Sequence, residues 1–294
     1  MKTLEQEVFE LLEKSKMNYS VVKEPLHLPD GKQTQFFGVV RSDDKTCFGT
    51  CTDRYEVFQN HEMAELAFKI KEESGYKIDR SRVYRDGAKV SIDLVGEEVY
   101  LEYPKVGDLM QKSIRMTNTH DGSGALKLAL GSLVLSCTNG MTRWVEGRGA
   151  SIRHTTNMKS LIDNALRSFE FMQEKEQNFI DEIKKMIEVD VNENQIADLM
   201  QSITDVDVRK VSMSGGTWKS DEYSTRAINK TVSLFESIKE EIDYKGANAW
   251  GLLNGVTHFT SHKAGRDSSR SESKVFGGLM QTDKKAYDFC LNLV

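Results

Sequence analysis

The spacing of apolar residues changes once along this chain of 294 residues, and the change limits the folds that it can adopt. Up to about residue 150, short apolar runs alternate with polar residues, as in half-buried β-strands. From residue 157 to residue 188, apolar residues recur every three or four positions without an intervening Gly or Pro. The sequence therefore predicts an α+β fold: a curved, mainly antiparallel sheet followed by a long helix and a helical C-terminal region.

We expect two parts that meet at residues 155 and 156, or a single continuous domain built from both. Residues 1–155 would hold the β-rich core with an N-terminal helix, and residues 156–294 the long helix and the helical C-terminal region. A helix of some thirty residues is about 45 Å long. Such a helix would pack on the sheet at one end and reach another element or subunit at the other.

Apolar periodicity and turn residues give the individual elements. In the first part we predict helices over residues 3–16 and 61–74, an extended linker over 21–31, and strands over 36–41, 46–52, 55–59, 88–94, 99–103, 112–117, 126–130 and 133–137. In the second part we predict helices over residues 157–188, 193–204, 225–242, 248–262 and 283–293, a loop over 212–219, and a mobile polar segment over 264–273. Asp86-Gly87 and Asp121-Gly122 mark tight turns.

Composition narrows the classes of partner. The net charge of -5 argues against a protein that contacts DNA over its whole surface, but allows a local basic groove on an acidic body. No apolar segment approaches the roughly 20 residues of a membrane helix. The N-terminus lacks the pattern of a signal peptide, and four cysteines are few for the length. We therefore expect a cytoplasmic protein with free thiols and no membrane partner.

Motifs for catalysis and metal binding are weak. The glycine pairs lack the Lys-Ser/Thr step of a phosphate-binding loop. Cys47 and Cys51 have no second cysteine pair to complete a zinc site, and His258 and His262 lack the glutamate of a zincin helix. His154 has no nucleophile in a recognisable turn nearby. We therefore predict no enzymatic activity, no cofactor and no bound metal.

A basic segment is the most suggestive functional feature. Between residues 142 and 159 it carries Arg143, Trp144, Arg148, Arg153, His154 and Lys159. Guanidinium groups bind phosphates through paired hydrogen bonds, and aromatic rings stack on bases. Arg115 and Lys127 on preceding strands would extend the same surface. The alternative is a solvated loop whose arginines pair with Glu146 or with neighbouring carboxylates.

Four ordered motifs resemble a known family. They are His120-Asp121-Gly122-Ser123, Cys137-Thr138-Asn139-Gly140, Arg153-His154-Thr155, and the stretch from residue 249 to residue 257 that contains Trp250, Asn254 and Thr257. They resemble the successive signatures of the phage- and plasmid-like proteins of domain-of-unknown-function family 932. The resemblance extends from about residue 37 to residue 293 and implies a mobile-element setting without an established activity. The order of sheet and long helix is also similar, in topology only, to single-strand annealing proteins.

Three hypotheses follow. The first is a non-enzymatic phage protein that binds single-stranded DNA, and anneals it in recombination, through the basic segment. Residues 120–123 would shape the groove edge, and homo-oligomeric rings or filaments would align many modest sites. The second is a counter-defence protein that binds and inhibits a host immune complex through its long helix and acidic C-terminal half. The third, weaker hypothesis is a metal-dependent hydrolase that uses His120, Asp121 and His154.

Overall fold

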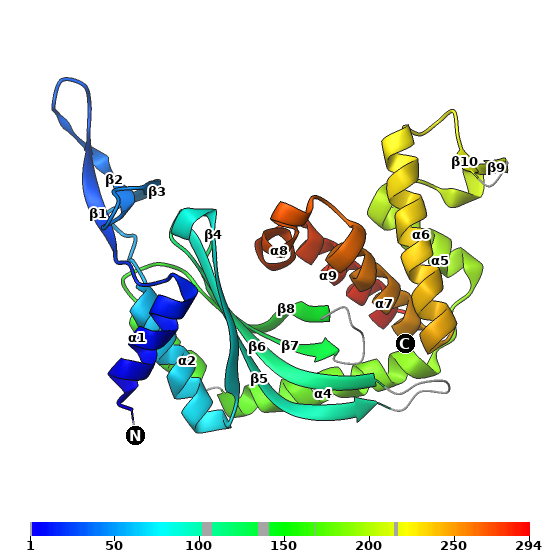
Figure 1. Cartoon of the computed structure of the whole chain (residues 1–294), viewed down its shortest axis with the longest axis horizontal. Coiled ribbons are helices and arrows are strands. Elements are labelled where there is room, and N and C mark those ends of the chain that lie inside the picture. Colours follow the sequence, from blue (N-terminus) through cyan, green and yellow to red (C-terminus); the bar gives the residue numbers. More distant parts are fainter. Residues whose placement is uncertain (1, 102–107, 135–140, 168, 215–216) are drawn as a thin grey trace. The chain divides into compact units, whose positions relative to one another are not determined.

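The computed structural model describes residues 2–101, 108–134, 141–167, 169–214 and 217–294. It confirms the predicted α+β fold, with antiparallel sheets and a helical C-terminal region (Figure 1). The chain divides into two compact units: unit 1 comprises residues 1–97, 112–131 and 146–175, and unit 2 comprises residues 98–111, 132–145 and 176–294. The boundary predicted at residues 155 and 156 lies inside unit 1, because the first helix after that point packs on the sheet.

Unit 1 begins with α1 (Leu4–Ser15), whose first turn is closed by a capping box between Thr3 and Gln6. A small antiparallel sheet follows, in the order β1 (Val21–His27), β2 (Gln33–Arg41) and β3 (Cys47–Thr52). The prediction of an extended linker over residues 21–31 is therefore corrected, because most of that segment is a strand. Pro25 is tolerated in β1 because this strand lies at the edge of its sheet.

The main sheet has five strands that follow one another in sequence order. They are β4 (Lys77–Tyr84), β5 (Lys89–Leu101), β6 (Asp108–Thr119), β7 (Leu126–Val134) and β8 (Met141–Ile152). The turn predicted at Asp86-Gly87 connects β4 to β5, and Asp86 there adopts φ 53°. β4 was not predicted. The strand predicted over residues 99–103 coincides at residues 99–101 with the end of β5, and residues 102 and 103 lie outside the described residues. Residues 142–152, for which a solvated loop was the alternative, belong to β8.

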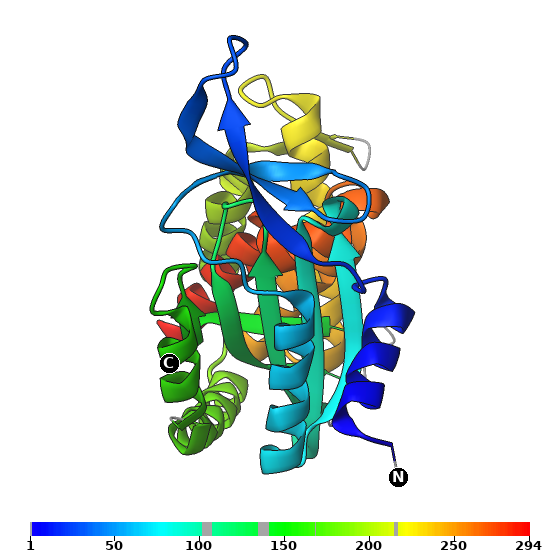
Figure 2. The same ribbon diagram turned by 90° about the vertical axis from the view of Figure 1, so that its left-hand side faces the viewer.

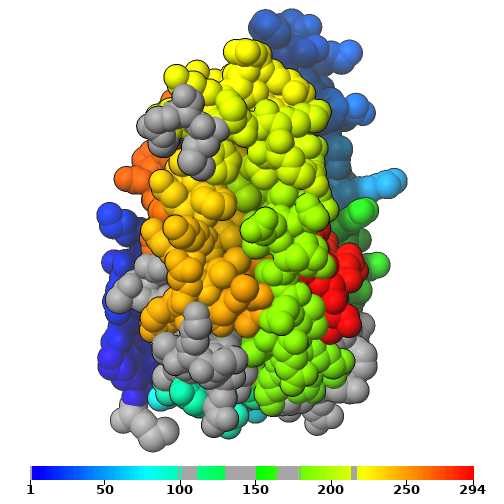
Figure 3. Space-filling view, turned by 90° about the vertical axis from the view of Figure 1, so that its right-hand side faces the viewer, coloured from blue at the N-terminus to red at the C-terminus, as the bar shows by residue number. Residues whose placement is uncertain are grey.

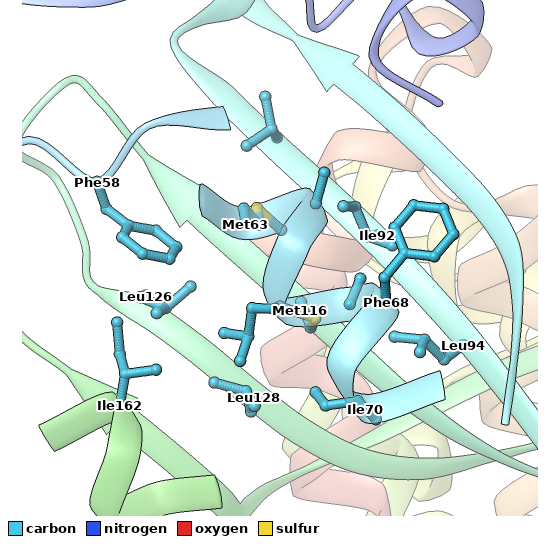
Figure 4. Packing of buried hydrophobic residues seen from close by; sticks show 14 of the residues in the cluster. Phe58, Met63, Phe68, Ile70, Ile92, Leu94, Met116, Leu126, Leu128 and Ile162 are labelled. Carbon is cyan, nitrogen blue, oxygen red and sulfur yellow. The ribbon is translucent and has the colours of Figure 1, made fainter. Parts of the chain in front are cut away.

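Helices cover one face of this sheet. α1, α2 (Asn60–Ser74) and α3 (Met158–Arg167) pack their apolar side chains on it (Figure 2). Figure 4 shows the contact at close range, where Met63, Phe68 and Ile70 of α2 meet side chains of β5, β6 and β7. Gly75 ends α2 with φ 72°, as its position after the apolar repeat predicts. The predicted strand over residues 55–59 is absent, because this stretch has no ladder partner among the described residues and leads into α2.

The predicted long helix is present on both sides of residue 168, which lies outside the described residues. Its two parts are α3 and α4 (Phe169–Glu188). Ile180, Ile183 and Met186 of α4 belong to the core of unit 2. The three-to-four spacing therefore identified helical segments, with α3 in the core of unit 1 and α4 in the core of unit 2. Whether they form the single helix of the prediction depends on residue 168, outside the described residues.

Unit 2 is helical. Its further elements are α5 (Glu193–Thr204), η2 (Val208–Lys210), β9 (Ser212–Ser214), β10 (Thr217–Lys219), α6 (Thr225–Lys245), α7 (Ala249–His258), η3 (Phe259–Lys263), α8 (Asp267–Phe276) and α9 (Gly278–Leu291). α5 and α6 adjoin on the surface that Figure 3 presents. Two predictions are corrected: residues 212–219 include a short hairpin, and residues 267–273 are helical rather than mobile. None of the helices in the described parts of the chain has both the length and the apolar character that crossing a bilayer requires.

Candidate nucleic-acid interface

The second face of the main sheet is polar. In the β4–β5 ladder, Val83 lies opposite Val90 on the face that packs on the helices. Successive side chains of a strand point to opposite faces, so Arg82, opposite Ser91, lies on the other one. By the same alternation, the polar face carries Arg80, Arg82, Lys89, Ser91, Asp93, Ser113, Arg115, Thr117 and Lys127. Five of these side chains are cationic, and carboxylates lie beside three of them: Asp79 beside Arg80, Asp121 beside Lys89 and Asp93 beside Arg115. The middle of this face, from Lys89 to Asp93 and from Ser113 to Thr117, is buried.

A buried ion pair lies in the middle of the polar face. The Arg115 guanidinium donates to both carboxylate oxygens of Asp93, through Nε at 2.7 Å and through Nη2 at 2.8 Å. Both side chains are buried, at 5% and 6% exposure. Such a bidentate pair fixes two adjacent strands to each other. We therefore correct the prediction for Arg115, because its guanidinium is part of the sheet framework and not of an exposed surface.

The motif at residues 120–123 forms a tight turn next to this face. Asp121 Oδ1 accepts hydrogen bonds from the backbone N–H of Ser123 at 3.0 Å and from its hydroxyl at 2.6 Å. Gly122 takes the left-handed φ of 73° that the turn requires. Lys89 Nζ lies 3.6 Å from the Asp121 carboxylate. These contacts make the motif a structural corner that neutralises a second cation of the polar face.

His120 lies in the interior of unit 1. Its Nε2 is 3.0 Å from Asn60 Oδ1, and its ring stacks on Phe48 with Tyr19 at its edge. Burial is the main cause that lowers the pKa of His120 to about 3, and the neighbouring His154 lowers it further. The imidazole is therefore neutral at pH 7. In this position it supports packing and does not attract phosphate.

His154 is buried as well. Its Nδ1 donates to the backbone carbonyl of Glu56 at 3.0 Å, and its ring stacks on Tyr55 with centroids 4.9 Å apart. Burial lowers the pKa of His154, and the hydrogen bond to Glu56 opposes that shift. The prediction that His154 binds nucleic acid is corrected on the same ground, because its ring is neutral and enclosed. It holds the end of β8 against the segment before α2.

The remaining predicted cations have different surroundings. Arg153 is exposed directly after β8, and Lys127 is half-buried on β7. Lys159 on α3 is 86% exposed, with Nζ 3.3 Å from the Glu62 carboxylate. Arg143, Trp144 and Arg148 lie on β8, but their side chains lie outside the described residues. Arg153 is thus the predicted arginine whose side chain the structure places in solvent.

The C-terminal motif residues belong to a helix interface in unit 2. Trp250, Asn254 and Thr257 are buried on α7. Asn254 Nδ2 donates to the carbonyl of Trp250 at 2.8 Å, and the Thr257 hydroxyl donates to the carbonyl of Asn254 at 3.0 Å. Gly255 allows α7 to approach α6, because a Cβ there would lie 2.4 Å from the Cα of Ile238. This motif therefore specifies packing, and the predicted Asn139 lies outside the described residues.

The sequence prediction missed two arginines of the polar face. Arg80 and Arg82 lie on β4, and the side chain of Arg80 is 47% exposed. A bulge between residues 78 and 80 interrupts the alternation of this strand. The sequence did contain one indication of this surface: two arginines two positions apart, a spacing that places both on the same face of a strand.

Two cysteines and two histidines lie four positions apart in the sequence, at 47 and 51 and at 258 and 262. In the described part of the chain, no group of three or more His, Cys, Asp or Glu side chains is arranged to hold a metal ion. Cys47 is exposed and Cys51 is buried. The His258 and His262 rings lie 5.1 Å apart, and His258 Nδ1 lies 3.6 Å from the Glu240 carboxylate. These residues do not form a multi-ligand site.

Comparison with known proteins places the chain in a family. Residues 47–280 match the family described as Domain of unknown function (DUF932), which is well over half of the sequence. No curated protein and no solved structure matches the chain. The matched range includes the turn at residues 120–123 and the α7 motif, whose contacts are structural. The chain belongs to the DUF932 family.

Proposed function

We propose that the protein binds single-stranded DNA, without catalysing a reaction on it, through cations at the margins of the polar face, on β4 and directly after β8. The observation that supports this proposal is the presence of arginines that are not buried: Arg80 and Arg82 on β4, and Arg153 directly after β8. Arg80 is 47% exposed, although the Asp79 carboxylate lies 3.9 Å from its Nε. Arg80, Arg82 and the exposed Arg153 would bind backbone phosphates. Guanidinium groups suit this role because their forked donors match phosphate oxygens.

The paired cations would define the shape of the surface. Arg115 is bound to Asp93, and Lys89 lies beside Asp121, so these side chains hold fixed positions. The centre of this face is buried, so a flexible strand would contact the cations at its margins. Recognition would therefore be electrostatic and independent of sequence, and affinity should fall steeply with salt.

The biological setting belongs to the same proposal. We place the protein in the cytoplasm of a host cell, as a homo-oligomeric product of a phage or another mobile element that supports annealing in recombination. The alternative, a counter-defence protein that binds and inhibits a host immune complex, stays a prediction. A binding titration separates the two, because the second requires no affinity for nucleic acid.

The test is a fluorescence anisotropy titration of the full chain with a labelled single-stranded oligonucleotide at two salt concentrations. The double variant Arg80→Glu/Arg82→Glu should weaken binding at least tenfold and reduce the slope of log K against log salt by about one per lost contact. A matched control is Lys14→Glu/Lys69→Glu, which makes the same change of charge on α1 and α2, on the other side of the sheet.

Two results would contradict the proposal. One is the absence of binding by the unmodified protein at low salt. The other is equal affinity of the sheet variant and the helix variant, which would show that attraction depends only on net charge. The variant Arg153→Ala tests whether the position directly after β8 contributes to binding. The variant Arg148→Ala tests a position within β8.

A further inference from the structure

A cavity in unit 2 has no role in the proposed function. Its volume is about 710 Å³. It lies where the first turn of α6, the π-helical turn η3, the start of α8 and part of α9 come together. Wide π-helical turns of this kind are often found at binding sites. The volume falls within the range of pockets that take small molecules, roughly 300 to 1,000 Å³.

The lining of this cavity is strongly cationic. It includes Arg226, Lys230, Lys263 and Arg266, and no carboxylate among the described residues that line it. The side chains of Arg226 and Arg266 are exposed and make no hydrogen bond or ion pair within the described chain. Lys263 is partly neutralised from outside the cavity, because Glu236 and Glu240 lie 3.9 and 3.6 Å from its Nζ.

Lys230 adds a positive group that is only partly compensated. Its Nζ donates to the backbone carbonyl of Ile203 at 2.8 Å. Partial burial lowers the pKa of Lys230, and nearby Lys285 acts in the same direction while Asp205 opposes it. An anion in the cavity would offset the cost of holding this ammonium group charged.

Arginines lie at the starts of two helices that border the cavity. α6 has Arg226 in its first turn and no acidic residue there, although the positive end of a helix favours negative groups. α8 follows Arg266 directly, and the carboxylate of its first residue, Asp267, pairs with Arg270 instead. Two helices therefore begin with an arginine beside the same hollow. A bound anion would interact favourably with both guanidinium groups and both helix ends.

We infer that this cavity, which we call the basic cavity, binds a small molecule that carries two or three linked phosphates, such as a nucleoside diphosphate or triphosphate. The four cations match several negative charges on one ligand. Asn229 and Ser233 line the same space and offer an amide and a hydroxyl, while Leu279 and Phe259 supply an apolar wall for an uncharged part. The inference concerns binding alone and does not depend on nucleic-acid binding by unit 1.

The experiment is isothermal titration calorimetry of the full chain with adenosine triphosphate and, separately, with inorganic triphosphate at constant ionic strength. We expect both to bind, because the phosphates provide most of the attraction. Arg226→Ala and Arg266→Ala should each weaken binding about tenfold or more, the effect of losing a hydrogen bond to a charged group. Lys239→Ala is the matched control, because it removes an exposed positive charge from the same helix outside the cavity.

Every outcome of this experiment either supports or overturns the inference. Absence of binding by both phosphate probes would overturn it, and so would equal affinity of the cavity variants and Lys239→Ala. Circular dichroism melting of every variant distinguishes lost binding from lost folding. If an unlabelled oligonucleotide binds the cavity more tightly than either triphosphate, and the arginine variants abolish that binding, the ligand is a nucleic acid backbone and the small-molecule assignment fails. The variant Arg80→Glu/Arg82→Glu tests unit 1 separately, since it leaves the basic cavity unchanged.

Discussion

Arg115, at the centre of the polar face in unit 1, and the two arginines of the basic cavity in unit 2 differ in how their charges are compensated. Arg115 is buried and binds both oxygens of Asp93. Arg226 and Arg266 are exposed and make no such contact within the described chain. Removing one partner of a buried pair leaves an uncompensated charge in the interior, whereas an exposed cation without a carboxylate is available to a ligand. The difference predicts opposite consequences for the stability of the protein when Arg115 and when Arg226 is replaced.

The largest effect should follow from breaking the buried pair. Arg115→Ala leaves the Asp93 carboxylate buried without its guanidinium and should lower the free energy of unfolding by about 3 to 5 kcal/mol. Urea denaturation measures this change. Arg153→Ala, at an exposed position of the same unit, should alter stability by less than about 0.5 kcal/mol. Equal effects of the two variants would mean that Arg115 is not a framework residue.

The next effect concerns the neutral histidine beside the polar face. Because burial lowers the pKa of His120 to about 3, the unfolded chain binds more protons than the folded one between pH 6.5 and pH 3. Stability from this residue is complete above pH 6.5 and is lost as the pH falls, by roughly 3 kcal/mol between pH 7 and pH 4. His120→Gln should be less stable at pH 7 but should show a flatter pH profile. Parallel profiles for the two proteins would contradict the burial of a neutral ring.

A smaller effect tests the packing of the α7 motif in unit 2. Gly255→Ala would place a methyl group 2.4 Å from the Cα of Ile238, so α6 and α7 must separate. We expect a loss of about 1 to 3 kcal/mol in thermal or urea unfolding. Gly278→Ala is the control, because a Cβ there meets no atom within 4 Å. If Gly255→Ala behaves like that control, the glycine of the motif serves a purpose other than close packing.

The fold could be predicted from sequence where local patterns agree with the final structure. The alternation in β5 and the Asp86-Gly87 turn identified their elements, and so did Gly75 at the end of α2. β4 was missed because a bulge breaks its alternation. α8 was missed because Val275 is its one buried residue, which leaves too narrow an apolar stripe to detect.

The candidate sites were harder to predict because their contacts join distant segments. Arg115 and Asp93 are 22 positions apart, and only the strand register brings them together. The basic cavity draws Arg226, Lys263 and Arg266 from the starts or ends of different helical elements, none of which has a phosphate-binding motif. The sequence shows which residues are cationic, but it does not show which carboxylate or ligand each cation contacts. The pairing of each cation is therefore information that the folded structure adds.

The smallest predicted effect is an increase in stability on replacing Arg226. It is also the most direct test of the comparison between Arg115 and the cavity arginines. Arg226→Ala removes a cation from the first turn of α6, where the helix dipole disfavours it, so the ligand-free protein should gain about 0.3 to 1 kcal/mol at low ionic strength. Arg226→Lys keeps the charge and should show no such gain.

In saturating inorganic triphosphate the order should reverse, because the unmodified protein binds the anion more tightly and is stabilised by mass action. Thermal melts with and without triphosphate measure both signs. If Arg226→Ala destabilises the ligand-free protein, then Arg226 has a structural partner and the contrast between the two units fails.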